Sequence, residues 1–342
     1  IDSIYFTEDY KKGSLTLKLT YRYAKEAPQI PLGYELGFDQ LILKEPLLSF
    51  PPTAITPTAS NHWEENRTSI TIVGDDFCYT FDKLHGTFQT LLRNNKSILE
   101  RPMEYNIWRA PTDNDRKIRK DWEAARYNRS MIRVYETHVA QEGSTVSITT
   151  RLAIHAIQIQ HILDLEATWN INADGTITLS LDATRNEALP YLPRFGLRLF
   201  LPKSYEAIHY FGYGPFESYV DKRRASYFAR FDTTVTDTYE DYLKPQEHGS
   251  HFGCNELSLA SKDGDILSFF ASSPFSFQAS HYPQEELSAK AHNYELTASD
   301  YTVLCLDYKM SGIGSNSCGP SLSKEYQLCE TSFSFDMMLR FR

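Results

Sequence analysis

Short runs of alternating apolar and polar residues, separated by turn residues, recur from Thr68 to the end of the chain. Alternation puts the apolar side chains on one face of an extended segment and so predicts half-buried strands. The clearest runs are 68–73, 76–81, 145–154, 162–169, 176–182, 195–201, 266–271, 275–280 and 302–309. Helical periodicity is limited to 119–129 and 284–291. The pattern predicts a large antiparallel all-β domain.

The first 45 residues hold two further strand-like runs, 14–23 and 33–43. An isolated pair of strands is only marginally stable, so we expect residues 1–45 to be the end of a domain that begins before Ile1. Residues 46–67 carry four prolines among Thr, Ser and Asn, which predicts an extended linker. The predicted large β domain therefore covers residues 68–342.

Charge and hydropathy limit the classes of partner. The formal net charge is −9, and the longest basic run is only Lys222-Arg223-Arg224, which argues against nucleic acid and anionic membranes. Apolar runs fall short of the ~18 residues that span a bilayer. The five cysteines are scattered without a C-x-x-C pair, so structural zinc is not expected and a reducing compartment is favoured. We expect a cytoplasmic protein; because the chain starts at Ile1 rather than Met, a lost signal peptide and a periplasmic location stay open.

Three polar segments are candidates for a catalytic or metal site. Segment 109–116 (RAPTDNDR) lacks the spacing of a calcium loop, so a structural loop capped by Asp and Asn is favoured over a cation site. Segment 212–221 contains Glu217 and Asp221, and a carboxylate pair is what a glycosidase uses. Because Lys222-Arg223-Arg224 follow closely, we interpret Glu217 as an ion-paired structural carboxylate.

Segment 244–249 (KPQEHG) places Glu247 beside His248, a residue that can act as a base. Adjacent residues of an extended segment point to opposite faces, so the two side chains are not expected to cooperate. We interpret this segment as a polar structural junction.

Segment 311–320 (SGIGSNSCGP) combines a tight Gly-x-Gly turn with a polar loop. It lacks the third glycine and the strand–turn–helix context of a dinucleotide site. The turn is instead suited to displaying Asn316, Ser317 and Cys318.

These four segments, together with 280–282 (SHY), 292–296 (HNYEL) and 307–310 (DYKM), follow one another as in bacterial family 2 β-galactosidases. Over 76–335 the chain resembles the C-terminal domain of those enzymes. The resemblance implies a large antiparallel supersandwich of the galactose-mutarotase type over 68–342. It also implies that residues 1–45 are the end of an immunoglobulin-like domain.

The resemblance further implies a retaining β-galactosidase whose two catalytic glutamates lie in a (β/α)8 barrel that this chain lacks. It implies no catalytic residue, metal ligand or cofactor in this chain, with Mg and Na held by the barrel. The expected partners are that barrel and a galactoside at the active-site rim, contacted by Asn316, Ser317 and Cys318; homo-oligomer formation stays open. Some family members carry a Trp where Cys318 stands, and a thiol cannot stack on a sugar as an indole can.

Two other functions stay open at this point. One is a free-standing carbohydrate-binding module that uses the groove of the supersandwich. The other is an aldose mutarotase, which needs a His and a Glu facing each other across a groove. The sequence does not reveal such a pair among its ten histidines.

Overall fold

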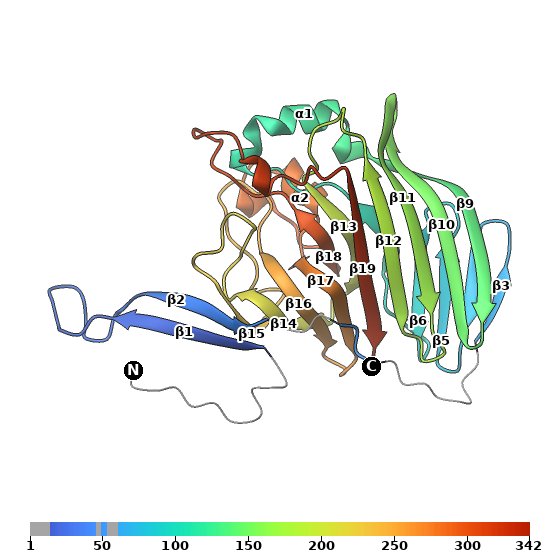
Figure 1. The fold of residues 1–342 in the computed structure, drawn as a ribbon, viewed down its shortest axis with the longest axis horizontal. Helices are drawn as coiled ribbons and strands as arrows, with labels where there is room; N and C mark the ends of the chain where they lie inside the picture. The colour runs from blue at the N-terminus through green and yellow to red at the C-terminus, as the bar shows by residue number, and fades with distance from the viewer. Residues whose placement is uncertain (1–13, 46–48, 53–60) are drawn as a thin grey trace. The chain divides into compact units, whose positions relative to one another are not determined.

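The computed structural model describes residues 14–45, 49–52 and 61–342 (Figure 1). The chain divides into two compact units, Ile1–Ser49 and Phe50–Arg342, and the boundary falls inside the predicted linker 46–67. Each unit is described by itself.

The described part of the first unit is a β-hairpin. Strands β1 (Leu15–Arg22) and β2 (Glu35–Lys44) pair antiparallel, with Leu19 opposite Asp39. These strands match the predicted runs 14–23 and 33–43 to within two residues. Several large apolar side chains of this unit are exposed: Leu32, Tyr34, Leu36, Leu41, Ile42 and Leu43. That residues 1–45 end an immunoglobulin-like domain stays a prediction, and residues 1–13 lie outside the described residues.

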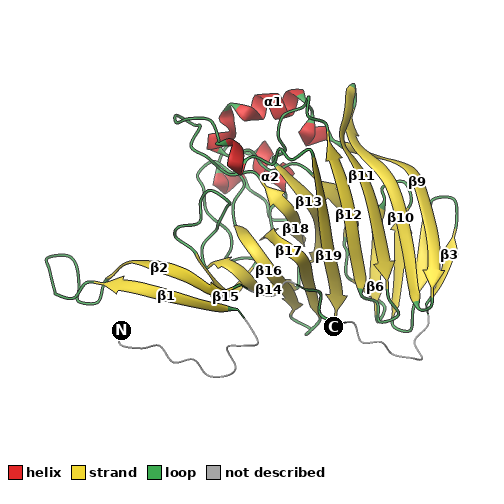
Figure 2. Ribbon diagram, in the orientation of Figure 1, coloured by secondary structure: helices red, strands yellow, loops and turns green. Residues whose placement is uncertain are grey.

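Most strands of the second unit belong to one antiparallel sheet (Figure 2). Within residues 61–342 its main path has the order β15 (Tyr227–Thr234), β14 (Tyr205–Gly214), β16 (Ser250–Ser261), β17 (Ile266–Ser280), β19 (Ser332–Phe341), β12 (Ile177–Arg185), β11 (Ile159–Ile171), β10 (Thr145–Ala156) and β9 (Met131–Glu142). A branch adds β18 (Tyr301–Met310), β13 (Arg194–Pro202) and β8 (Arg101–Asn106).

The sheet branches at β17. Its first half pairs with β19 over Leu267–Ala271, and its second half pairs with β18 over Ser276–Ser280. The runs 266–271 and 275–280, predicted as two strands, are therefore one strand that changes partner near Pro274. Alternation alone cannot distinguish two separate strands from one strand that changes partner, because the neighbouring strands determine where the pairing changes.

A smaller antiparallel sheet precedes the large one in the chain. It has the order β3 (His62–Glu65), β4 (Ser69–Val73), β5 (Phe77–Asp82), β6 (Thr87–Arg93) and β7 (Lys96–Ser97). Strand β3 lies inside the stretch 46–67 that was interpreted as linker. Its four residues, HWEE, show little apolar alternation, and pairing with β4 fixes them as a strand.

Aromatic side chains join the two sheets of the second unit. The Phe88 ring meets the Trp169 ring edge-to-face at 5.3 Å, and Phe81 meets Phe88 at the same centroid distance. Tyr79 of the small sheet lies 5.8 Å from Phe341 of the last strand. These rings are buried and belong to the core of the second unit. The predicted large antiparallel all-β supersandwich is confirmed.

Helix within the described ranges is limited to short segments. Helix α1 (Ile118–Ala124) is followed by the 3-10 turn η3 (Tyr127–Arg129), and α2 (Gln284–Ala289) follows β17. Arg126 has φ +58°, so the predicted helix 119–129 is broken in two. The remaining 3-10 turns are η2 (Asp113–Arg116), η4 (Asn293–Glu295) and η5 (Lys324–Tyr326). Among these described helices none is long and apolar enough to cross a membrane.

Candidate functional site

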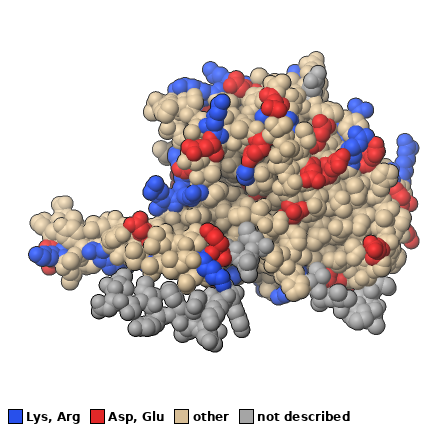
Figure 3. Space-filling view, viewed as in Figure 1, with Lys and Arg blue, Asp and Glu red and all other residues tan. Residues whose placement is uncertain are grey.

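The four polar segments singled out in the sequence line one cleft of about 210 Å³ in the second unit. Its lining residues are Thr112, Asp113, Asn114, Glu217, Tyr219, Lys222, Tyr242, Gln246, Glu247 and Ile313. Residues as far apart in the chain as Thr112 and Ile313 are therefore neighbours here. Acidic and basic side chains are interspersed over the face of the second unit seen in Figure 3.

A buried ion pair shapes segment 109–116. The Arg109 guanidinium donates to both carboxylate oxygens of Asp115, at 3.1 and 2.7 Å. Asp115 also accepts from the backbone N–H of Thr112 at 2.9 Å, which closes the turn before η2. Burial by itself would lower the pKa of Arg109, but the charge of Asp115 raises it above its ordinary value. Asp115 thus caps a structural loop, the role favoured from the sequence.

Arg109 also reaches the loop 311–320. It donates to the carbonyl oxygen of Ser311 at 2.5 Å and to that of Gly312 at 3.0 Å. Its guanidinium lies 5.5 Å from the centre of the Trp122 ring on α1. One fully buried side chain therefore links segment 109–116 to the distant loop.

Asp221 holds the same loop through backbone N–H groups, whereas Arg109 binds backbone carbonyl oxygens. Its two carboxylate oxygens accept from the backbone N–H groups of Ile313 at 2.9 Å and Gly314 at 2.7 Å. A Cβ at Gly312 would come within 2.6 Å of the Asp221 carboxyl carbon, and Gly314 has φ +67°. The close approach of Asp221 requires Gly312, and the left-handed backbone conformation favours glycine at position 314. Asp221 is committed to the loop.

Glu217 is held by neutral donors. It accepts from the Tyr219 hydroxyl at 3.0 Å, from the Gly249 N–H at 2.9 Å and from the Tyr242 hydroxyl. Burial, with Glu217 alongside, raises the pKa of Tyr219 well above its ordinary value, so its hydroxyl remains a donor.

The predicted ion pair between Glu217 and the run 222–224 was wrong. Among the described residues no basic side chain pairs with Glu217. Arg223 instead lies over the rings of Tyr213 and Phe252, at 5.3 and 4.9 Å. Closeness in sequence was a poor guide: Arg223 packs on aromatic rings, and Lys222 lines the same cleft as Glu217 without an ion pair to it.

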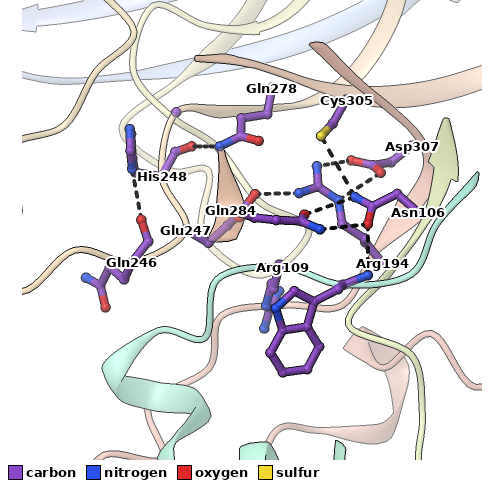
Figure 4. Close-up of polar contacts among 12 residues, drawn as sticks. Asn106, Arg109, Arg194, Gln246, Glu247, His248, Gln278, Gln284, Cys305 and Asp307 are labelled. Atoms are coloured by element: carbon purple, nitrogen blue, oxygen red, sulfur yellow. Dashed lines mark hydrogen bonds and ion pairs between the residues drawn. The ribbon is translucent and has the colours of Figure 1, made fainter. Parts of the chain in front are cut away.

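A second buried arginine fixes segment 244–249 (Figure 4). Arg194 donates to both carboxylate oxygens of Asp307, at 2.9 and 2.6 Å, and to Oε1 of Glu247 at 2.7 Å. All three side chains are fully buried. Burial would lower the pKa of Arg194, but Asp307 and Glu247 raise it well above its ordinary value. The remaining oxygen of Glu247, Oε2, is buried without a hydrogen-bond partner.

Glu247 and His248 face different surroundings, as expected for neighbours on an extended segment. The His248 ring packs edge-on against Tyr239 at 5.1 Å, and its Nδ1 lies 2.9 Å from the carbonyl oxygen of Gln246. Gln278 donates to the His248 carbonyl oxygen at 2.9 Å. His248 therefore has a structural role in the junction.

The tip of loop 311–320 carries the three predicted sugar-contacting residues. The amide oxygen of Asn316 accepts from Lys117 at 3.0 Å, and the Ser317 carbonyl oxygen accepts from Arg116 at 2.8 Å. Asn114 bonds the loop at the Gly314 carbonyl and the Ser317 N–H. Cys318 is exposed. The structure thus brings Asn316, Ser317 and Cys318 to a firmly held, accessible turn.

Arg194 and Tyr242 are site residues that the sequence reasoning missed. Arg194 opens strand β13, which is apolar apart from Arg194 and Arg198, and a charged residue at a buried strand position signals an ion pair in the core. No comparable signal marks Tyr242. In the part of the chain that the structure describes, no group of three or more His, Cys, Asp or Glu side chains is placed to hold a metal ion.

Comparison with known proteins places the chain in a family. The β-galactosidase small chain family matches residues 73–339, so the chain belongs to it. The β-galactosidase of Actinobacillus pleuropneumoniae is 43% identical over 325 residues, which are 94% of this chain and 32% of that protein. The β-galactosidase of Staphylococcus xylosus is 35% identical over 311 residues, 90% of this chain and 31% of that protein. The chain spans about a third of the length of these curated relatives.

Solved structures with a similar arrangement include epimerases. The galactose 1-epimerase of Lactobacillus acidophilus NCFM covers 83% of this chain and 98% of its own, with a TM-score of 0.43 and 9% identity. A protein of Escherichia coli K12 named as a putative aldose 1-epimerase covers 83% of this chain and 99% of its own, with a TM-score of 0.39 and 10% identity.

Proposed function

We propose that this chain is the C-terminal, non-catalytic part of a retaining β-galactosidase that hydrolyses terminal β-D-galactosides such as lactose. The observation that carries the proposal is the convergence of the family segments. Segments 109–116, 212–221 and 244–249 surround one cleft, and two of them fix loop 311–320 through Arg109 and Asp221. Such a scaffold serves to position a loop at the rim of an active site in the remaining polypeptide.

The carboxylates of the cleft support a structural rather than a catalytic role. Glu217 accepts three hydrogen bonds, Asp221 accepts two from backbone N–H groups, and Glu247 pairs with Arg194. A retaining glycosidase needs two carboxyl groups about 5–5.5 Å apart that are directed at the substrate bond. Here the carboxylates are directed at the protein's own donors.

In this proposal the partners are the remaining two thirds of the enzyme and the galactoside. The catalytic glutamates and the Mg and Na sites belong to that remaining part. Asn316, Ser317 and Cys318 contact the sugar at the rim, with Cys318 contributing a small side chain where some relatives place an indole.

A mutarotase function has less support. His281 and Glu206 are close, but they bond directly to each other, with His281 Nε2 3.0 Å from Glu206 Oε2. That contact leaves no space for a sugar ring between them.

The test is hydrolysis of o-nitrophenyl β-D-galactoside by the purified chain, which we expect not to occur. Glu217→Gln and Glu247→Gln variants are the controls for a contaminating enzyme. Any residual rate that both variants leave unchanged comes from a contaminant. A rate that either variant abolishes, while the variant stays folded, contradicts the proposal.

A further inference from the structure

We propose that an apolar patch formed by Phe216, Tyr242, Leu243 and Tyr294 is the surface with which this chain docks against the remaining two thirds of the enzyme. This inference rests on the proposed function, because it takes that remaining part as the partner. It goes further by assigning the residues that meet the partner.

The first argument is the exposure of the patch. Leu243 and Tyr294 are 82% and 80% exposed, the highest values among the large apolar side chains that the structure describes. Phe216 and Tyr242 are exposed as well. Single exposed apolar residues are normal on a protein surface, whereas a group of them marks a site of contact with another surface.

The second argument is that the centre of the patch is pre-formed. The backbone N–H of Asn293 donates to the carbonyl oxygen of Leu243 at 3.0 Å, and the Asn293 side chain donates to Asp241 at 2.7 Å. The Tyr294 ring stacks on the ring of His292, with centroids 5.2 Å apart and planes only 11° from parallel. Because these loops are already fixed to each other, their apolar side chains lose little conformational entropy on binding.

The third argument is the position of the patch beside loop 311–320. The Tyr242 hydroxyl donates to the carboxylate of Glu217, the residue that follows Phe216. Tyr242 and Glu217 also line the cleft, together with Ile313 of loop 311–320. The patch and the loop therefore border one opening. A polypeptide that brings an active site to this loop lies beside the patch as well.

The fourth argument identifies the partner. In the relatives from A. pleuropneumoniae and S. xylosus the matching region is 32% and 31% of a single polypeptide. The other two thirds are tethered to this region, which gives them an effective concentration on the order of millimolar. A second copy of the chain has to compete from free solution. The tethered part is therefore the occupant that the patch fits best.

The experiment is hydroxyl-radical footprinting, which measures how fast exposed side chains are oxidised. The chain alone is compared with a full-length chimera in which it replaces the matching third of the A. pleuropneumoniae β-galactosidase. In the chimera the oxidation rates of Leu243 and Tyr294 should fall about fivefold, because anchor side chains become desolvated at an interface. Ile157 is the matched control. It is 61% exposed in the turn between β10 and β11, outside the patch, and should keep its rate.

A pair of substitutions tests whether the patch stabilises the contact. Leu243→Ser and Tyr294→Ser, made together in the chimera, should lower the urea concentration at which half of the o-nitrophenyl β-D-galactoside hydrolysis is lost. Ile157→Ser should leave that concentration unchanged. In the chain alone all three positions are exposed, so the substituted chains should unfold as the wild type does.

The activity of the chimera reports on the proposed function, whereas protection of the patch reports on this inference. An active chimera in which Leu243 and Tyr294 are oxidised as fast as in the chain alone overturns the inference only. A folded, inactive chimera with a protected patch contradicts the proposed function but supports the docking surface, and one without protection overturns both. Protection in the chain alone that disappears on dilution identifies a second copy as the occupant and also overturns the inference.

If the chimera does not fold, the natural A. pleuropneumoniae enzyme replaces it in the footprinting. Its side chains aligned with Leu243 and Tyr294 should then be protected, and the one aligned with Ile157 should be accessible. The reverse pattern overturns the inference.

Discussion

Replacement of Arg109 by methionine tests whether buried charged groups hold the site together. Arg109 is fully buried and makes two hydrogen bonds to Asp115 and two to the carbonyl oxygens of Ser311 and Gly312. Methionine keeps an unbranched side chain but has no donor. The substitution therefore removes all four contacts and leaves the carboxylate of Asp115 buried.

The structure sets the size of the effect. Removing one member of a buried ion pair costs about 3–5 kcal/mol. Asp115 keeps the hydrogen bonds from the Thr112 backbone and hydroxyl, which favours the lower end of that range. The two carbonyl groups that lose a donor add about 1 kcal/mol each. We expect the free energy of unfolding to fall by about 5 kcal/mol.

The assay is urea unfolding followed by tryptophan fluorescence, to which Trp122 contributes from beside Arg109. Arg230→Met is the matched control. Arg230 pairs with Glu256 at the same 2.7 Å as the shorter Arg109–Asp115 contact, but its side chain is 68% exposed. Exposed pairs contribute about 0–1 kcal/mol, so this control should change little.

A double-mutant cycle completes the test. Asp115→Asn in the Arg109→Met background removes the unpaired charge, so the double variant should recover about 2 kcal/mol relative to the sum of the single losses. The reasoning is refuted if Arg109→Met costs no more than Arg230→Met, or if the two substitutions at the buried pair are additive.

Three further predictions follow from single contacts. Gly312→Ala should lower the free energy of unfolding by about 2 kcal/mol in urea titrations, because its Cβ would meet the Asp221 carboxyl at 2.6 Å; an unchanged value would contradict that contact. Burial lowers the pKa of His251 to about 4, below its ordinary 6.5, so the unfolded chain takes up the proton first as pH falls. Wild type should therefore lose about 3 kcal/mol between pH 6.5 and 4 that His251→Gln does not lose, and parallel pH profiles of urea unfolding would refute this. In an enzyme restored with its missing part, Cys318→Trp should lower KM about threefold through ring stacking; a KM equal to that of the unsubstituted enzyme argues against a rim position.

The fold class was predictable because it depends on local alternation. The runs 145–154 and 176–182 became β10 and β12 with small changes at their ends. What depends on neighbours was not predictable. Strand β3 exists because it pairs with β4, and β17 is continuous because two different strands flank it.

The candidate site was predictable as segments but not as an arrangement. The motifs at 109–116 and 311–320 could be singled out from residue type alone. Their contact through Arg109 could not, because a side chain's partner across 202 positions leaves no local signal. The ion pair predicted for Glu217 was wrong for the same reason. The residues 222–224 are close to Glu217 in the sequence, but sequence distance does not determine which groups their side chains contact.

The central claim is that this chain completes a β-galactosidase rather than acting alone. The direct measurement mixes the purified chain with the A. pleuropneumoniae relative lacking its matching third, and follows the hydrolysis of o-nitrophenyl β-D-galactoside. We predict that neither polypeptide hydrolyses the substrate alone and that the mixture does, with Arg109→Met chain restoring less activity. Hydrolysis by the chain alone, or a mixture that forms a complex but stays inactive, would contradict the account.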